Sequence, residues 1–183
     1  LLKDALEASR YHPWEIPFTQ VGGLHTGFPQ LFSSHPFKTQ KDYDDYISRL
    51  AAFPKAMADA IANARRGLKA GNMPPRLVIE ATLAQVRPLT SGDSARAPFL
   101  EPLKAFPAGI EPGQQARLRA AVARQLDEGV TPAYLRLLAF LEQDYLPHGR
   151  KEPGLWALPQ GPAYYRFLTR HHTTTHMDPA AIH

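Results

Sequence analysis

An apolar stripe between Pro112 and Pro147 constrains the fold of this chain more than any other feature. Its members recur at three- and four-residue steps: Leu118, Val122, Leu126, Val130, Tyr134, Leu137, Leu138, Leu141 and Tyr145. This period is typical of a helix that buries one face. Gly129 and Pro132 interrupt the stripe. We therefore expect two successive helices, the second capped by Thr131 with Pro132 as its first residue.

A second stripe of the same period runs from Thr39 to Gly71. Its members are Tyr43, Tyr46, Ile47, Leu50, Met57, Ile61, Ala64 and Leu68. Pro54 lies inside it, and a proline removes one backbone hydrogen bond, so this helix should be kinked or split there. Another helix is expected from Pro75 to the stop at Pro88. Residues 39–88 are thus predicted to form a helical pair.

The remaining pattern also favours helices. Residues 88–110 are interpreted as a linker with a brief helix around residues 100–105, and residues 111–183 as a helical region in which Pro162 opens a last long helix. No segment alternates with period two for long enough to indicate a strand. The predicted class is all-α, as an irregular helical array within a larger helical fold.

Residues 11–38 differ from the rest because they are aromatic-rich and show no strong period. Tyr11, Trp14, Phe18, Phe28, Phe32 and Phe37 are spread among glycines and prolines. We interpret this segment as an ordered coil with a short extended piece around residues 18–24. Loops of this length inside a compact domain are uncommon and often functional.

Both ends of the chain have the composition of helices that continue beyond it. Asp178 followed by Pro179 is a strong helix start, yet only four residues follow. The other end begins without Met and is already helical in composition. We therefore expect one partial helical segment, truncated at both ends, whose main partner is the remainder of its own chain.

Composition excludes several classes of function. The net charge is +4, but the 21 basic and 17 acidic residues are interspersed, so nucleic-acid binding is not expected. No apolar run approaches the length of a transmembrane segment. The chain has no Cys, which excludes disulfides, thiol catalysis and cysteine metal sites within these residues.

No catalytic or metal motif is present, but a few residues are candidates for substrate binding. Gly22 and Gly23 precede His25 in the aromatic coil, where they either bring backbone close to a ligand or form a turn that needs a positive φ. Tyr164 and His172 complete the candidate set. His172 and His176 have the spacing of a helical metal pair, but the three threonines between them disfavour a helix. No metal ligand is therefore assigned.

Several short motifs together resemble a known bacterial family. They are TQVGGLH at 19–25, RLAAFP at 49–54, MPPR at 73–76, VTPAY at 130–134, DYLP at 144–147 and GLWALP at 154–159. Their order along almost the whole chain is similar to that of the family known as domain of unknown function 885. Members of about six hundred residues are often exported or lipid-anchored bacterial proteins.

The resemblance implies an all-helical fold similar to the carboxypeptidase Taq group of zinc metallopeptidases. The family's expected zinc helix, His-Glu-x-x-Pro-Gly-His, would follow residue 183. The resemblance thus implies zinc and a peptide substrate for the full-length parent, with this segment serving as scaffold and cleft wall and not catalytic alone. It also implies a periplasmic or membrane-anchored location. A non-enzymatic helical binding module remains the alternative.

Overall fold

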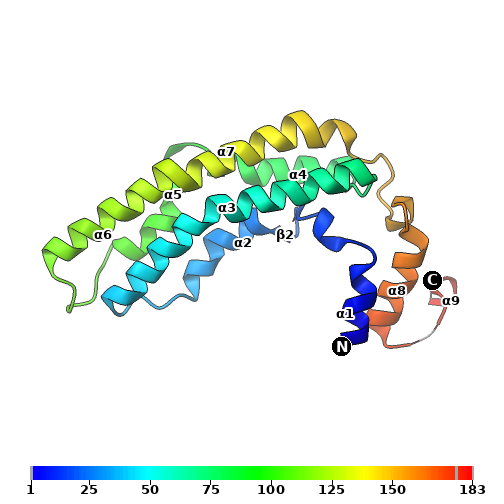
Figure 1. Cartoon of the computed structure of the whole chain (residues 1–183), viewed down its shortest axis with the longest axis horizontal. Helices are drawn as coiled ribbons and strands as arrows, with labels where there is room; N and C mark the ends of the chain where they lie inside the picture. Colours follow the sequence, from blue (N-terminus) through cyan, green and yellow to red (C-terminus); the bar gives the residue numbers. More distant parts are fainter. Residues whose placement is uncertain (1, 176, 183) are drawn as a thin grey trace.

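The computed structural model describes residues 2–175 and 177–182, and it confirms the all-α class (Figure 1). The helices are α1 Leu2–Ser9, α2 Leu24–Gln30, α3 Gln40–Ala70, α4 Arg76–Val86, α5 Gly92–Leu100, α6 Pro112–Gln125, α7 Thr131–Phe140, α8 Gly161–Thr173 and α9 Pro179–Ile182. Short 3₁₀ turns cover Pro13–Glu15, Leu31–Ser33, Arg87–Leu89, Glu101–Leu103, Leu146–His148 and Leu155–Ala157. Strands β1 Phe18–Thr19 and β2 Gly22–Gly23 pair antiparallel, with Phe18 opposite Gly23.

The stripe between Pro112 and Pro147 forms one continuous helical rod, so the predicted break at Gly129 is wrong. Two π-helical turns, Leu126–Val130 and Leu141–Tyr145, join α6, α7 and the 3₁₀ turn that follows. The first wide turn precedes Pro132, the second residue of α7, where the proline removes one backbone N–H donor without ending the rod. Thr131 is helical and does not cap a new start.

Helix α3 begins and ends as predicted, but Pro54 does not split it. Thr39 and Asp42 form a reciprocal capping box at its start. Gly71 ends it in the left-handed conformation with φ 73°. The 31-residue helix runs through Pro54 without a break.

The core lies between α3, α4 and the α6–α7 rod, which lie alongside one another in Figure 1. Leu50 and Leu137 are completely buried there. An aromatic layer joins α2 to this core, because Phe28 stacks on Phe53 with ring centroids 4.0 Å apart and Phe53 contacts Tyr134. Such burial of apolar area supplies most of the favourable free energy of folding.

The aromatic segment 11–38 is more regular than the predicted coil. The extended piece is present as β1 and β2, but the next residues form α2. This helix contains Gly27 and Pro29, which disfavour a helix in isolation. Tertiary packing outweighs that preference, because His25 and Phe28 of α2 are buried together with Phe32 of the next turn. Phe28 and Phe32 pack against Phe53 and Tyr46 of α3.

The segment 88–110 is not a plain linker, since α5 and a 3₁₀ turn occupy its middle. Phe99 and Leu103 are buried. Two tyrosines of α3 form hydrogen bonds with this segment. The Tyr46 hydroxyl donates to the Phe99 carbonyl at 2.6 Å, and the Tyr43 hydroxyl donates to the Pro102 carbonyl at 3.3 Å. These contacts explain why a segment with four prolines contains α5 and the 3₁₀ turn that follows it.

Helices α1, α8 and α9 form a smaller group beside one end of the long helices, so the first and the last helix of the described residues lie together (Figure 1). Arg170 of α8 pairs with Glu7 of α1 at 2.6 Å. Asp178 caps α9 as predicted, accepting from the Ala180 N–H at 2.9 Å. Within residues 2–175 and 177–182, no helix has both the length and the hydropathy needed to cross a membrane.

Candidate functional site

A sharp turn after α1 starts the candidate site. His12 takes the left-handed conformation, with φ 50° and ψ 50°, and redirects the chain into the 3₁₀ turn Pro13–Glu15. Residues other than glycine rarely adopt this backbone conformation. The strained backbone persists only where surrounding contacts stabilise it. Asn72 provides one, because its Nδ2 donates to the His12 carbonyl at 3.3 Å.

Gly67 lets the chain before β1 approach the end of α3. A Cβ at this position would lie 2.5 Å from the Glu15 carbonyl and 2.8 Å from the Asn72 carbonyl. The Asn72 N–H donates to the Gly67 carbonyl at 2.8 Å, which fixes the α3–α4 connection at the same place. The site therefore depends on the absence of a side chain at residue 67.

The carboxylate of Glu15 lies at the floor of the site. Its Oε2 accepts from Nδ2 of Asn72 at 3.2 Å, and its Oε1 lies 3.4 Å from Nδ1 of His12. The Glu15 side chain is only 11% exposed, whereas that of His12 is 51% exposed. One amide thus holds both the strained turn and the buried carboxylate.

Two tyrosines form the opposite wall. Tyr11 stacks on Tyr164 of α8 with ring centroids 4.7 Å apart and planes at 19°, and the Tyr11 hydroxyl donates to the Ala163 carbonyl at 3.4 Å. Burial raises the pKa of Tyr164 above its ordinary value, so this phenol stays protonated at neutral pH.

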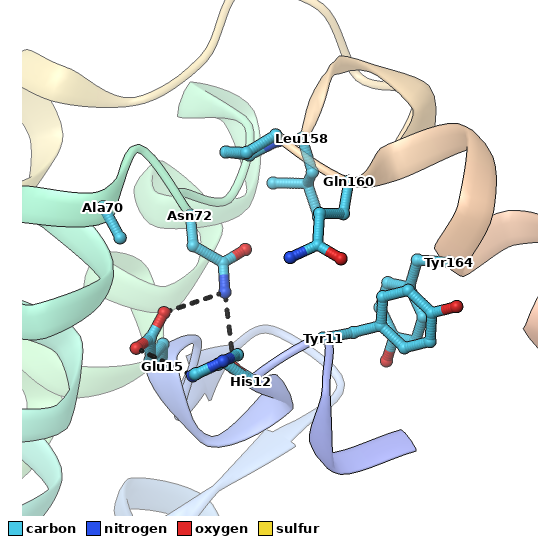
Figure 2. Close-up of a pocket in the computed structure, with 9 residues that line it drawn as sticks. Tyr11, His12, Glu15, Ala70, Asn72, Leu158, Gln160 and Tyr164 are labelled. Carbon is cyan, nitrogen blue, oxygen red and sulfur yellow. Dashed lines mark hydrogen bonds and ion pairs between the residues drawn. The ribbon is translucent and has the colours of Figure 1, made fainter. Parts of the chain in front are cut away.

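These groups enclose an open pocket of about 190 Å³. Its lining residues are Tyr11, His12, Glu15, Ala70, Asn72, Leu158, Pro159, Gln160 and Tyr164. Figure 2 shows Glu15 and His12 on one side, the tyrosine pair on the other, and the amides of Asn72 and Gln160 between them. The pocket joins the long helices to the group of α1 and α8, and it combines one buried negative charge with amide and aromatic groups.

The structure separates the five predicted site residues. Tyr164 lines this pocket, while His172 lines a different, mainly apolar hollow between α8 and α9, together with Leu168 and Ile182. Gly22, Gly23 and His25 line neither of them. The predicted set does not form a single site.

His25 is completely buried. Its Nε2 lies 3.2 Å from Oε1 of Gln85, and its carbonyl accepts from the Tyr134 hydroxyl at 2.9 Å. Gly23 has φ 147°, and a Cβ there would lie 2.6 Å from the Pro17 carbonyl. This geometry favours the turn interpretation for Gly23 and a structural role for His25.

No group of three or more His, Cys, Asp or Glu side chains that could hold a metal ion is found in the described ranges. The rings of His171 and His172 lie 5.1 Å apart on α8. His176, the second member of the spacing considered above, lies outside the described residues. The donor set present in this part of the chain does not fit zinc.

Sequence reasoning missed most of the pocket, because its members are scattered. Tyr11, His12 and Glu15 lie in the segment interpreted as coil, and Asn72 lies in the turn after α3. One signal was available: Glu15 is a carboxylate between Trp14 and Ile16 in an aromatic segment, and a charge in such a setting is rare unless it has partners.

Comparison with known proteins places the chain in a family. The model described as "Bacterial protein of unknown function (DUF885)" matches residues 1–183. The chain belongs to the DUF885 family. The comparison with curated proteins gives no match.

A solved structure shares the fold of this DUF885 chain. It carries the description "The crystal structure of the putative lipoprotein from Colwellia psychrerythraea", and it is 26% identical with a TM-score of 0.84. The match covers 91% of the DUF885 chain described here but only 29% of that protein. The chain thus spans less than a third of the length of this relative.

Proposed function

We propose that these residues form scaffold and part of the substrate cleft of a larger, zinc-dependent peptidase-like protein. The observation that carries the proposal is the pocket around Glu15 and Tyr164, where a buried carboxylate, amides and an aromatic wall face one open space. Ligand sites commonly combine an apolar lining with a few polar groups that fix orientation. The class of reaction is inferred from the sequence resemblance to zinc peptidases alone, because the DUF885 family is described as being of unknown function.

In this proposal, the zinc site lies in another part of the parent protein. The described residues hold no group of three ligands, so no catalytic step is assigned to them. In a peptidase of this type, zinc polarises the peptide carbonyl and activates a water molecule. The role proposed for Tyr164 and its neighbours is to hold a peptide substrate.

We also propose that the parent protein is exported and anchored to a membrane by lipid. The solved relative is described as a "putative lipoprotein", and this supports the same location for the parent. Labelling the full-length protein in cells with a radioactive fatty acid, followed by fractionation, tests this. Unlabelled protein in the cytoplasmic fraction would contradict it.

A helical binding module is the alternative function, and one observation favours it. An open hollow of about 580 Å³ lies between the end of α2 and α5, with a mainly apolar lining. Its lining residues are Pro29, Phe32, Ser33, Phe37, Ala97, Pro98, Glu101 and Pro102. A hollow of this kind suits an apolar segment of a partner protein.

The full-length parent protein decides between the two functions. Metal analysis and a peptide-mixture cleavage assay should show about one zinc per chain and cleavage that a chelator abolishes. Tyr164→Leu should lower turnover with unchanged zinc content, while Glu128→Gln, an exposed change on the α6–α7 rod, should not. Absence of zinc and of cleavage would leave the binding module as the function. Unchanged turnover in Tyr164→Leu would exclude Tyr164 from the cleft.

A further inference from the structure

Glu15 is the least exposed carboxylate among the ion pairs of the described residues. The other pairs join a carboxylate to Lys or Arg, and each of those carboxylate side chains is at least 33% exposed. Glu15 is 11% exposed, and its ion-pair partner is His12, which carries charge only when protonated. A buried carboxylate without a full positive charge beside it is costly.

The carboxylate also keeps room for another donor. Its two oxygens offer about four acceptor positions. The hydrogen bond from Asn72 and the contact with His12 use one position on each oxygen. A ligand with N–H donors and a positive charge would satisfy the remaining positions and the charge together.

The opposite wall suits the same kind of ligand. The stacked rings of Tyr11 and Tyr164 lie across the pocket from Glu15 (Figure 2). Leu158 and Pro159 add apolar surface to the lining. Aromatic faces attract cations and also contact apolar groups. A ligand carboxylate would instead meet the negative charge of Glu15.

The size of the pocket limits the ligand further. Its volume of about 190 Å³ is below the roughly 300 to 1,000 Å³ of sites for drug-sized molecules. It therefore fits the end of a molecule, and the remainder of the ligand would lie in the open mouth.

From these observations we propose that this pocket binds a primary ammonium group carried on an apolar or aromatic body. Glu15 supplies the negative charge, and the Tyr11–Tyr164 pair contacts the body. Asn72 is a positioning residue, because its amide holds the carboxylate and the strained His12 turn together. The proposal concerns binding and does not depend on the peptidase function.

Two sources could present this ammonium group, and the probes distinguish them. Phenethylamine represents a free amine, and the peptide Phe-Gly-Gly presents the ammonium group of a peptide amino terminus. N-acetyl-Phe-Gly-Gly lacks that charge, and 3-phenylpropionate replaces the ammonium group by a carboxylate. Binding to the full-length protein, treated with a chelator to stop turnover, is measured by titration calorimetry.

We expect phenethylamine, Phe-Gly-Gly or both to bind. The affinities of N-acetyl-Phe-Gly-Gly and of 3-phenylpropionate should be at least tenfold lower. If phenethylamine and Phe-Gly-Gly bind with similar affinity, a free amine is a sufficient ligand. If only Phe-Gly-Gly binds, the ligand is the amino terminus of a peptide. Failure of both ammonium probes to bind, or equal binding of 3-phenylpropionate, would overturn the proposal. This comparison uses the wild-type protein, so it stands even if a variant does not fold.

Variants then locate the binding. Glu15→Gln keeps the shape of the side chain and removes its charge. It should lower the affinity for the ammonium probe at least tenfold. Glu128→Gln removes an exposed charge elsewhere and should leave the affinity unchanged. Equal affinity in wild type and in folded Glu15→Gln would place the binding outside this pocket and overturn the assignment. Loss of zinc or of peptide cleavage in the parent has no bearing on these outcomes.

Discussion

A Cβ on Gly129 would lie 3.2 Å from Cγ of Pro54. The residue that was expected to break the rod thus packs against the residue that was expected to break α3. The π-helical turn Leu126–Val130 meets α3 at this point, and the proline ring fills the space that a side chain on residue 129 would need. Two helix-disfavouring residues therefore make a close helix contact possible.

Gly129→Val should destabilise the protein by about 1 to 3 kcal/mol, because a branched side chain must push α3 and the rod apart. Chemical denaturation measures this free energy of unfolding. Gly113→Val is the control, since Gly113 lies in α6 with no atom within 4 Å of its added Cβ. Equal midpoints for the two variants would show that the Pro54 contact is not tight.

Leu137→Ala should destabilise by about 2 to 5 kcal/mol, because Leu137 is completely buried in the stripe of α7 and the change leaves a cavity. Leu135 lies on the same helix but is 48% exposed. Leu135→Ala should lower the free energy of unfolding far less. Similar denaturation midpoints for both variants would mean that the buried face of α7 is assigned wrongly.

Gly67→Ala should destabilise by about 1 to 3 kcal/mol and open the pocket, because the new Cβ meets the carbonyls of Glu15 and Asn72. Thermal unfolding and hydrogen exchange of the Asn72 amide report the two effects. Gly27→Ala has open space around its Cβ and should not lower stability in this way. An unchanged exchange rate at Asn72 in Gly67→Ala would argue against the close approach.

The buried imidazole of His25 should make stability depend on pH. Burial lowers its pKa below the ordinary value of 6.5, and the hydrogen bond with Gln85 offsets part of that shift. Below about pH 6.5 the unfolded chain therefore binds a proton that the folded chain does not. The contribution is fully present above pH 6.5 and is lost as the pH falls toward the lower folded-state pKa.

Urea unfolding at pH 8 and at pH 5 tests this sign. The wild type should lose more stability between the two values than His25→Gln, which has no titrating imidazole at this position. The other histidines are common to both proteins, so the difference isolates His25. A larger loss in the variant would mean that the folded state favours the protonated ring.

The polypeptide of residues 1–183 alone should bind no stoichiometric zinc and hydrolyse no peptide. The reason is that the described residues bring no three suitable ligands together. Elemental analysis of protein purified without a histidine tag checks the metal content. One tightly held zinc per chain would show that ligands gather in a way that the structure does not describe.

Periodicity along the chain was enough to predict the helical elements that bury a regular stripe. Leu50 in α3 and Leu137 in α7 repeat at the helical period, and the hydrophobic effect acts on that pattern regardless of the partner. Local chemistry also determined where some helices start and end, as at the Thr39 cap, Gly71 and Asp178. These signals are short in range and are visible in the sequence.

Only the tertiary structure determined the conformation of the residues that interrupt the helical pattern. Gly129 and Pro54 disfavour a helix in isolation, yet in the folded chain both lie inside continuous helices and pack against each other. The pocket likewise needs Glu15 and Asn72, 57 positions apart, to meet at Gly67. Such contacts depend on which surfaces approach in the folded chain, and a local pattern carries no information about a partner that lies far along the sequence.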